Sequence, residues 1–340
     1  MNNKEIVLSK YIKGKLNAEP KAHSDIEKFL SNIFGFQIIT FEETNKVFTS
    51  KIYKYTNFIK KYFAMNKLAK ISELTIIQTP FTNVKSVLKK LKNKIIIIHD
   101  IEGLRNQKEK ILDKELKLYD SCDYIIVHNQ RMKDFLVERG ISYQKIYIVE
   151  LFDYFCIDNN EIKQIEFENP VVAYTGNLNK AKFISQLKQE NMRFTLELYG
   201  ARATNEFNND KIIYEGAFKP EELPSKIKGN LGLVWDGNYD ESDEYKSFKF
   251  YTKYNNPHKL SCYIAAGIPV IVWKKSAIAD FVRKYNIGYE ISNLYEINDI
   301  DFSDYEDKRK NTLDLREKVR NGYFIEHVIS EIRNDIKNTK

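Results

Sequence analysis

The stretch from Tyr254 to Trp273 constrains the fold more than any other part of the chain. Pro257 suits the first position of a helix, because its missing N–H would have no partner there. Asn255 or Asn256 can cap that helix, and Gly267 is expected to end it. The six residues that follow are nearly all apolar, which predicts a strand covered on both faces. A helix that leads directly into a buried strand is typical of an α/β protein.

The same alternation of apolar runs and helical spacing extends along the chain. Predicted strands are Ile6–Leu8, Phe36–Thr40, Leu74–Gln78, Lys94–His99, Tyr124–His128, Ile146–Glu150, Val171–Thr175, Phe194–Tyr199, Lys211–Tyr214, Leu231–Trp235 and Pro269–Trp273. Predicted helices include Asp25–Asn32, Val84–Leu91, Glu109–Tyr119, Met132–Arg139, Lys180–Gln189, Glu221–Lys226 and Ala277–Tyr285. This order favours parallel sheets with helices on both faces.

Several segments, in this order, resemble the GT-B glycosyltransferases, and within them the galactofuranosyltransferase-like group that includes the accessory glucosyltransferase of serine-rich-repeat adhesin glycosylation. These segments are Asn17–Asp25, His99–Arg105, Asp123–Asn129, Tyr174–Leu178, Tyr214–Pro224 and Leu233–Gly237. The resemblance spans almost the whole length of the chain. It implies two Rossmann-like, doubly wound α/β domains with an interdomain cleft.

A chain of 340 residues is long enough for two domains with separate cores. The polar, acidic segment Phe152–Asn169 is interpreted as their connection. The predicted domains are residues 1–155 for the acceptor and 156–322 for the donor. By resemblance, the segment 323–340 forms a helix that crosses back to the first domain. The acid-rich segment Glu296–Asp307 is expected to be a solvated loop.

Composition limits the classes of protein that the chain can belong to. Hydrophobic residues make up 43% of the chain, but no apolar run approaches the roughly 20 residues that span a bilayer. Three scattered cysteines, Cys122, Cys156 and Cys262, suit a reducing cytoplasm. The net charge of +7 is mostly lysine, and no nucleic-acid-binding module accompanies it. A cytoplasmic protein without membrane insertion or nucleic-acid partner is expected. The basic, aromatic segment Lys51–Lys70 is either a crossover helix or a surface for lipid or a partner.

On the donor side, two places suit the phosphates of a nucleotide sugar. Gly176 lets the backbone approach a ligand closely, Asn177 can cap the following helix, and Lys180 follows. The second place is the amino end of the helix near Pro257, where the helix dipole and a lysine favour an anion. The residues expected there are Asn256, Pro257, His258 and Lys259. The simpler alternative for the place at Gly176 is an ordinary strand-to-helix turn with solvent-exposed lysines.

The nucleobase is expected at the end of the strand that precedes Phe218. There Tyr214, Gly216 and Phe218 could offer backbone groups and aromatic stacking to uracil. Alternatively, these are core aromatics with turn glycines. Tyr199 by itself favours that second interpretation.

Acceptor residues are expected at the carboxyl ends of the strands in the first half. Asp100 is the first choice and His99 the second for the base that deprotonates the acceptor hydroxyl. The predicted acceptor-binding residues are Asn17, Lys21, His128 and Asn129. Asp100 could instead form a salt bridge with Arg105, and His128 could be a strand-end residue without a chemical role.

By resemblance, the chain is a metal-independent hexosyltransferase without a cofactor, for which a UDP-sugar is a co-substrate. UDP-glucose is the expected donor, and O-linked N-acetylglucosamine on a serine-rich-repeat glycoprotein is the expected acceptor. Alternatives are galactofuranosyl or other hexosyl transfer to a capsule or cell-wall polysaccharide, a non-catalytic GT-B partner subunit, and a nucleotide-sugar epimerase. A homo-oligomer, dimer or tetramer, is implied. Asp299-Ile-Asp301 is the nearest approach to a metal-binding DxD motif and is attributed to chance.

Overall fold

The structure is a computed structural model that describes residues 4–11, 18–42, 72–80, 88, 90–157, 167–201, 209–244 and 248–338. The chain divides into two compact units. Unit 1 comprises Met1–Val149 and Ile325–Lys340, and unit 2 comprises Glu150–Phe324. Asn17 and the basic segment 51–70 lie outside the described residues.

Unit 1 is built on a six-stranded parallel sheet with strand order β2-β1-β3-β4-β5-β6. Its strands are β1 (Lys4–Tyr11), β2 (Gln37–Glu42), β3 (Ser72–Gln78), β4 (Lys94–Ile97), β5 (Tyr124–Val127) and β6 (Ile146–Ile148). Every residue of β4 is buried, as expected for an apolar strand covered on both faces. Ile96 of β4 lies between Ile77 of β3 and Ile125 of β5 in the register.

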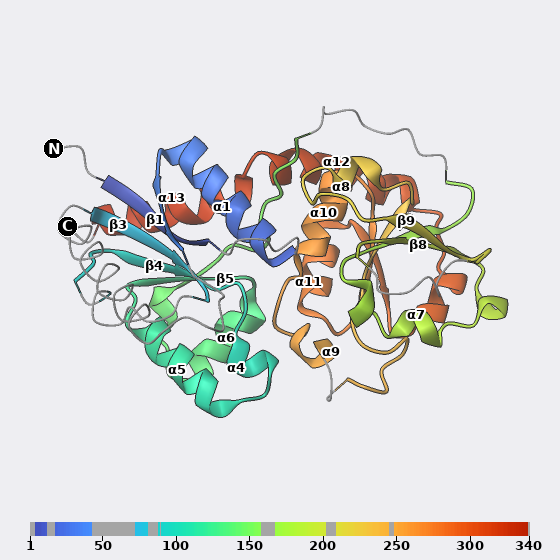
Figure 1. Ribbon diagram of the computed structural model, residues 1–340, viewed down its shortest axis with the longest axis horizontal. Helices are drawn as coiled ribbons and strands as arrows, with labels where there is room; N and C mark the ends of the chain where they lie inside the picture. The colour runs from blue at the N-terminus through green and yellow to red at the C-terminus, as the bar shows by residue number, and fades with distance from the viewer. Residues whose placement is uncertain are drawn as a thin grey trace. The chain divides into compact units, whose positions relative to one another are not determined.

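Helices cover both faces of this sheet. They are α1 (Ala18–Phe34), α4 (Glu102–Arg105), α5 (Glu109–Asp120), α6 (Gln130–Glu138) and α13 (Tyr323–Asn338). Figure 1 shows α1 and α13 on one side of the sheet and α4, α5 and α6 on the other. The short helix η1 (Tyr143–Lys145) precedes β6. In α1, Ala22, Ile26, Phe29 and Leu30 are buried, and this i, i+4, i+7 spacing places them on one helix face.

Unit 2 repeats the design with a second parallel sheet in the order β12-β11-β10-β7-β8-β9. Its strands are β7 (Val171–Thr175), β8 (Thr195–Tyr199), β9 (Ile212–Gly216), β10 (Leu231–Val234), β11 (Val270–Trp273) and β12 (Gly288–Ile291). The two wound sheets predicted from the sequence are confirmed. Strand β12 was not predicted, because only its last residue is fully buried and it therefore gives a weak apolar signal.

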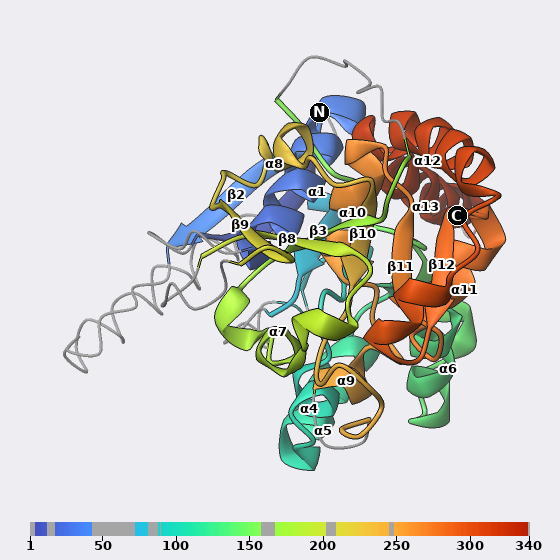
Figure 2. The same ribbon diagram turned by 90° about the vertical axis from the view of Figure 1, so that its right-hand side faces the viewer.

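The helices of unit 2 differ in length. They are η2 (Leu178–Lys180), α7 (Phe183–Gln186), η3 (Gln189–Asn191), α8 (Leu223–Lys226), α9 (Phe248–Tyr251), α10 (His258–Ala266), α11 (Ala277–Tyr285), η4 (Leu294–Asp299) and α12 (Tyr305–Arg320). Helix α10 packs against β10 and contacts both α8 and α12, as Figure 2 shows. Gly267, with φ +76, ends α10 in the left-handed conformation, as predicted.

Two predictions for unit 2 are wrong. The helix expected over Lys180–Gln189 is not continuous, because η2 ends at Lys180 and the α-helical part, α7, covers only Phe183–Gln186. The expected loop Glu296–Asp307 contains most of η4 and the start of α12. Ile297 and Tyr305 are buried in the core, whereas the six acidic residues of the segment are exposed, so the segment is amphipathic although its composition is acidic. These acids are Glu296, Asp299, Asp301, Asp304, Glu306 and Asp307.

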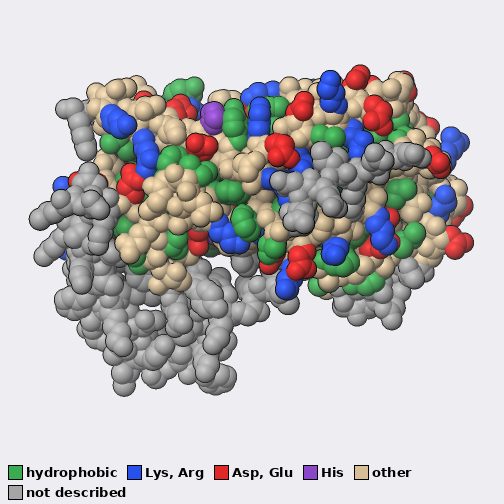
Figure 3. All heavy atoms as spheres, turned by 90° about the horizontal axis from the view of Figure 1, so that it is seen from above, with side chains coloured by type: hydrophobic (Ala, Val, Ile, Leu, Met, Phe, Trp, Pro, Cys, Tyr) green, Lys and Arg blue, Asp and Glu red, His purple; other side chains and the backbone are tan. Residues whose placement is uncertain are grey.

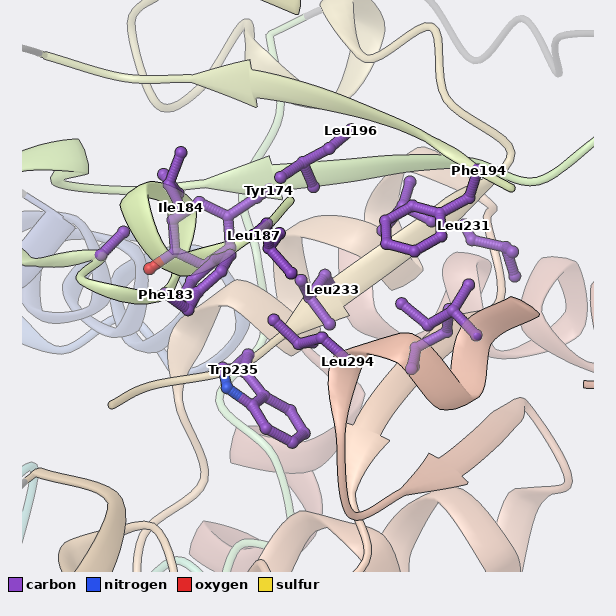
Figure 4. Packing of buried hydrophobic residues seen from close by; sticks show 14 of the residues in the cluster. Tyr174, Phe183, Ile184, Leu187, Phe194, Leu196, Leu231, Leu233, Trp235 and Leu294 are labelled. Carbon is purple, nitrogen blue, oxygen red and sulfur yellow. The ribbon is translucent and has the colours of Figure 1, made fainter. Parts of the chain in front are cut away.

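The core of unit 2 includes side chains from β7, β10, α7 and η4. Tyr174, Phe183, Leu233 and Leu294 are all buried in one hydrophobic cluster, and Figure 4 shows these side chains converging. Trp235, which follows β10, is 1% exposed and belongs to the same cluster. The strand ends that carry polar residues are therefore anchored by a packed interior. None of the described helices is both long and apolar enough to cross a membrane.

Candidate functional site

The backbone turn after β7 brings Gly176 against Lys259 of α10. Gly176 has φ +141, a conformation that side chains disfavour. A Cβ atom at Gly176 would lie 3.3 Å from Cε of Lys259. The neighbouring Gly200, with φ +145, is tighter still, because a Cβ there would lie 1.8 Å from the Gly176 carbonyl oxygen. The two predicted phosphate-binding places thus meet at the carboxyl end of the sheet.

Lys259 is held at this point by oxygen atoms. Its Nζ lies 2.9 Å from the Tyr174 hydroxyl, 3.4 Å from the Trp235 carbonyl oxygen and 3.6 Å from Oδ1 of Asp236. Burial opposes the charge of Lys259, but the Asp236 carboxylate and the hydroxyls of Tyr174 and Tyr263 outweigh it and raise the lysine pKa above its ordinary value. The side chain keeps 19% exposure, so the site presents a cation that solvent or a ligand can reach.

The amino end of α10 differs in detail from the sequence prediction. Pro257 is the N-cap residue, with no side-chain capping hydrogen bond, and the helix begins at His258. Asn256 is not the N-cap residue, because it precedes Pro257 in the chain, and its Nδ2 donates to the Glu150 carbonyl oxygen at 2.5 Å. The His258 ring lies 3.3 Å from the Asp153 carbonyl oxygen. Asn256 and His258 therefore attach this helix end to the segment 150–153. The positive end of the helix dipole lies at the same first turn of α10, which contains Lys259.

The other predicted donor residues lie on neighbouring turns. Asn177 caps η2 by accepting a hydrogen bond from the Asn179 amide at 3.1 Å, and Lys180 is exposed at the end of that turn. At the end of β9, the Phe218 ring lies 3.7 Å from where a Cβ on Gly216 would stand. Phe218 is 38% exposed, which suits an aromatic surface for a planar ligand.

Tyr214 and Tyr199 have structural contacts at the same strand ends. The Tyr214 hydroxyl donates to the Gly200 carbonyl oxygen at 3.1 Å. Tyr199 is buried and donates its hydroxyl hydrogen to Glu197 at 2.6 Å. Tyr199 is thus a core aromatic, in agreement with the second interpretation of that residue.

Sequence reasoning did not identify the residues that position Lys259. Tyr263 of α10 donates to the Leu233 carbonyl oxygen at 3.1 Å and accepts from the Thr175 amide at 2.9 Å. Its ring fits because a Cβ on Gly232 would stand 2.3 Å from it. Helix α10 is thereby fixed to the ends of β7 and β10. The sequence signals for the groups around Lys259 were the segments Tyr174–Leu178 and Leu233–Gly237, which contain Tyr174 and Asp236.

In unit 1, His99 and Asp100 follow β4. Asp100 forms an ion pair with Arg105 at 2.8 Å, and both side chains are less than one-third exposed. This is the structural alternative considered for Asp100. His99 lies 2.8 Å, through Nε2, from Oε1 of Gln78, and its backbone amide donates to the Thr79 hydroxyl. The His99 ring stacks on His23 of α1 with centroids 3.7 Å apart.

The predicted acceptor-binding residues are not all accessible. His128 is only 3% exposed, and burial lowers its pKa to about 4. Asn129 caps α6 by accepting a hydrogen bond from the Met132 amide at 3.0 Å. Lys21 is buried and paired with Asp25 at 2.7 Å. His128 and Lys21 thus lie in the interior of unit 1 instead of at an accessible rim, and Asn129 has a local structural role.

Charges on the surface are mixed. On the face shown in Figure 3, lysine and arginine side chains of the described residues are interspersed with carboxylates. The described ranges contain no group of three or more His, Cys, Asp or Glu side chains that could hold a metal ion.

The paired Rossmann-like units have counterparts among solved structures. Sucrose-phosphate synthase from Thermosynechococcus elongatus is similar with a TM-score of 0.63 and 12% identity, covering 99% of this chain and 100% of that chain. Anabaena HepE, solved in complex with UDP and glucose, is similar with a TM-score of 0.56 and 12% identity, covering 99% of each chain. The fold is therefore GT-B, the fold of many glycosyltransferases.

Sequence comparison gives the family. The Glucosyltransferase 3-like N-terminal domain matches residues 5–151, and the C-terminal domain of the same family matches residues 172–332. β-1,6-Galactofuranosyltransferase WbbI from Escherichia coli K12 is 32% identical over 267 residues, 76% of this chain and 77% of that protein. Glucosyltransferase 3 from Streptococcus gordonii is 26% identical over 270 residues, 76% of this chain and 78% of that protein. The chain belongs to the Glucosyltransferase 3-like family and is a glycosyltransferase.

Proposed function

We propose that the protein transfers a hexose from a UDP-sugar to a hydroxyl group of a glycan acceptor, and that unit 2 binds the donor. The observation that supports this most is the Lys259 cation beside the Gly176 turn, where Nζ bonds the Tyr174 hydroxyl at 2.9 Å. An accessible lysine, a glycine turn and a helix amino end together suit a diphosphate. A protein of the same fold, HepE, has been solved with UDP.

In the proposed reaction the acceptor oxygen bonds to the anomeric carbon of the sugar. The bond between that carbon and the diphosphate oxygen breaks, and UDP leaves with the electron pair. Negative charge then grows on the diphosphate, and Lys259 and the α10 dipole stabilise it electrostatically. We propose that this charge stabilisation makes the transfer independent of a metal ion and a cofactor.

The acceptor hydroxyl must also lose its proton. His99 and Asp100 both follow β4 and carry groups that can accept a proton, which makes them the candidates for this role. The Arg105 guanidinium contacts Asp100 at 2.8 Å, which ties that carboxylate to a partner that already neutralises it. We therefore favour His99 as the general base, and we keep Asp100 as the residue that fixes the following turn or replaces His99 as base.

For the donor and acceptor we propose glucose and O-linked N-acetylglucosamine on a serine-rich-repeat glycoprotein. The similarity to Glucosyltransferase 3 supports this choice. The second candidate is galactofuranosyl transfer in polysaccharide synthesis, because the 32% identical relative is a galactofuranosyltransferase. We further propose that the enzyme acts in the cytoplasm as a homo-oligomer, as implied by the family.

A two-stage experiment tests these proposals. Calorimetry with UDP comes first, and absence of binding would support a non-catalytic GT-B subunit instead. A screen of UDP-glucose, UDP-galactose and UDP-galactofuranose against monosaccharide and glycopeptide acceptors comes next, with product mass as the readout. Conversion of the donor sugar without any acceptor would indicate an epimerase and contradict the transfer proposal.

A further inference from the structure

The side-chain amide of Gln78, at the end of β3, has three polar neighbours whose chemistry fixes its orientation. Its Nε2 lies 3.1 Å from Oε1 of Glu27 and 3.3 Å from the His23 carbonyl oxygen. Both oxygens are acceptors, so the two amide hydrogens belong to them. The amide oxygen therefore faces His99, with Oε1 2.8 Å from the ring nitrogen Nε2.

An amide oxygen can only accept a hydrogen bond, so Nε2 of His99 must carry a proton. A neutral imidazole has one N–H, and the basic lone pair of His99 is then on Nδ1. The ring is also fixed from one side. His23 stacks on it with an interplanar angle of 13°, and His23 Nε2 lies 2.7 Å from the Thr79 carbonyl oxygen.

Glu27 anchors this arrangement. It is half-buried on α1, and its carboxylate is also hydrogen-bonded to the Ser9 hydroxyl. Asp100, which adjoins His99 in the chain, is paired with Arg105. Gln78 is 3% exposed, so water does not compete with its hydrogen bonds. The amide is thus held by a buried, directional network.

We propose that Glu27, Gln78 and His23 are positioning residues that hold His99 in the Nε2–H tautomer, with Nδ1 as the atom that accepts the proton of the acceptor hydroxyl. The last clause rests on the proposed transferase function, whereas the tautomer does not. A general base must present its lone pair, and a partner at the other ring nitrogen determines which nitrogen presents it. No contact of Glu27, Gln78 or His23 with substrate is required.

Nitrogen NMR of the 340-residue chain, labelled with ¹⁵N-histidine, tests the tautomer directly. The five histidines are recorded at pH 8, above the usual histidine pKa, and the His99 signals are assigned as those lost in His99→Asn. For His99 we expect a proton on Nε2 and no proton on Nδ1. Gln78→Leu should give a mixture of the two tautomers. Gln130→Leu is the matched control, because Gln130 is exposed on α6 and its side chain donates to Asp134.

A protonated Nδ1 in the unaltered protein overturns the proposal, and so does an unchanged His99 spectrum in folded Gln78→Leu. The first measurement needs no variant, so misfolding of Gln78→Leu leaves the proposal falsifiable.

Kinetics test the functional clause. Gln78→Leu should lower kcat about 10- to 100-fold, the range seen when a residue that orients a metal-binding histidine is lost, with KM for the UDP-sugar unchanged. His23→Phe keeps a flat ring against His99 and should retain more of kcat than His23→Ala. An unchanged kcat in Gln78→Leu contradicts the positioning role. If no acceptor is glycosylated but the Nε2–H tautomer is observed, the transferase proposal fails while the tautomer assignment stands.

Discussion

Replacing Lys259 by methionine tests the donor site. Methionine keeps most of the aliphatic stem that packs beside Gly176, but it removes the ammonium group that contacts Tyr174 and Asp236. A charge-assisted hydrogen bond contributes about 1.5–3 kcal/mol, which corresponds to a dissociation constant for UDP about 10- to 150-fold higher. Calorimetric titration with UDP measures this directly.

The same substitution should leave the protein folded. The Asp236 side chain is 34% exposed, so water can replace its lost partner, and the expected loss of stability is about 1–2 kcal/mol. Circular dichroism during urea unfolding measures that loss. Lys188→Met is the matched control, because Lys188 is an exposed lysine of unit 2. If Lys259→Met binds UDP within twofold of the parent while remaining folded, the diphosphate does not bind at Lys259.

Three further substitutions test other contacts. Gly176→Ala should weaken UDP binding, measured by calorimetry, and should destabilise the fold by about 1–3 kcal/mol, measured by urea unfolding. Gly140→Ala is its control, because Gly140 also has a positive φ but a Cβ atom there would meet no neighbouring atom within 4 Å. Gly232→Ala should destabilise the fold by several kcal/mol, because its Cβ would stand 2.3 Å from the Tyr263 ring; a normal urea midpoint would refute this packing. His128 is expected to be neutral in the folded state, with a pKa lowered to about 4, so its contribution to stability is complete above pH 6.5 and declines as the pH falls toward 4. Between pH 7 and 5 the parent should lose about 2 kcal/mol more unfolding free energy than His128→Leu, and parallel losses would show that His128 is already charged.

Much of the fold could be predicted from the sequence. The strand Val171–Thr175 and the helix Ala277–Tyr285 were predicted with the bounds observed. Their signals are local, because an apolar strand covered on both faces and an amphipathic helix each have a characteristic spacing. The predictions failed where that signal is weak. In Gly288–Ile291 three of four residues are only partly buried, and the segment after β7 consists of turns too short for a helical period.

The candidate site was predictable only in part. The glycine turn at Gly176 and the lysine at Lys259 were recognised as separate motifs, and the structure brings them together. Asp100 and Arg105 are five residues apart, so their ion pair could be anticipated as an alternative. By contrast, Gln78 and His99 lie at the ends of different strands. The hydrogen bonds of Gln78 to His23 and Glu27 of α1 join residues more than 50 positions apart.

Local patterns in the sequence predict that this chain alternates strands and helices, turns at particular glycines and places polar residues after its buried strands, because each of these properties depends on neighbours within a few residues. Which polar groups meet depends on the tertiary fold. Strand β1 lies between β2 and β3, and that order, with its register and crossover helices, sets Glu27 beside Gln78. In unit 2, the missing side chain of Gly232 admits the Tyr263 ring. Such contacts form between segments that are far apart in the sequence, and the sequence separation does not indicate that the segments are close in space.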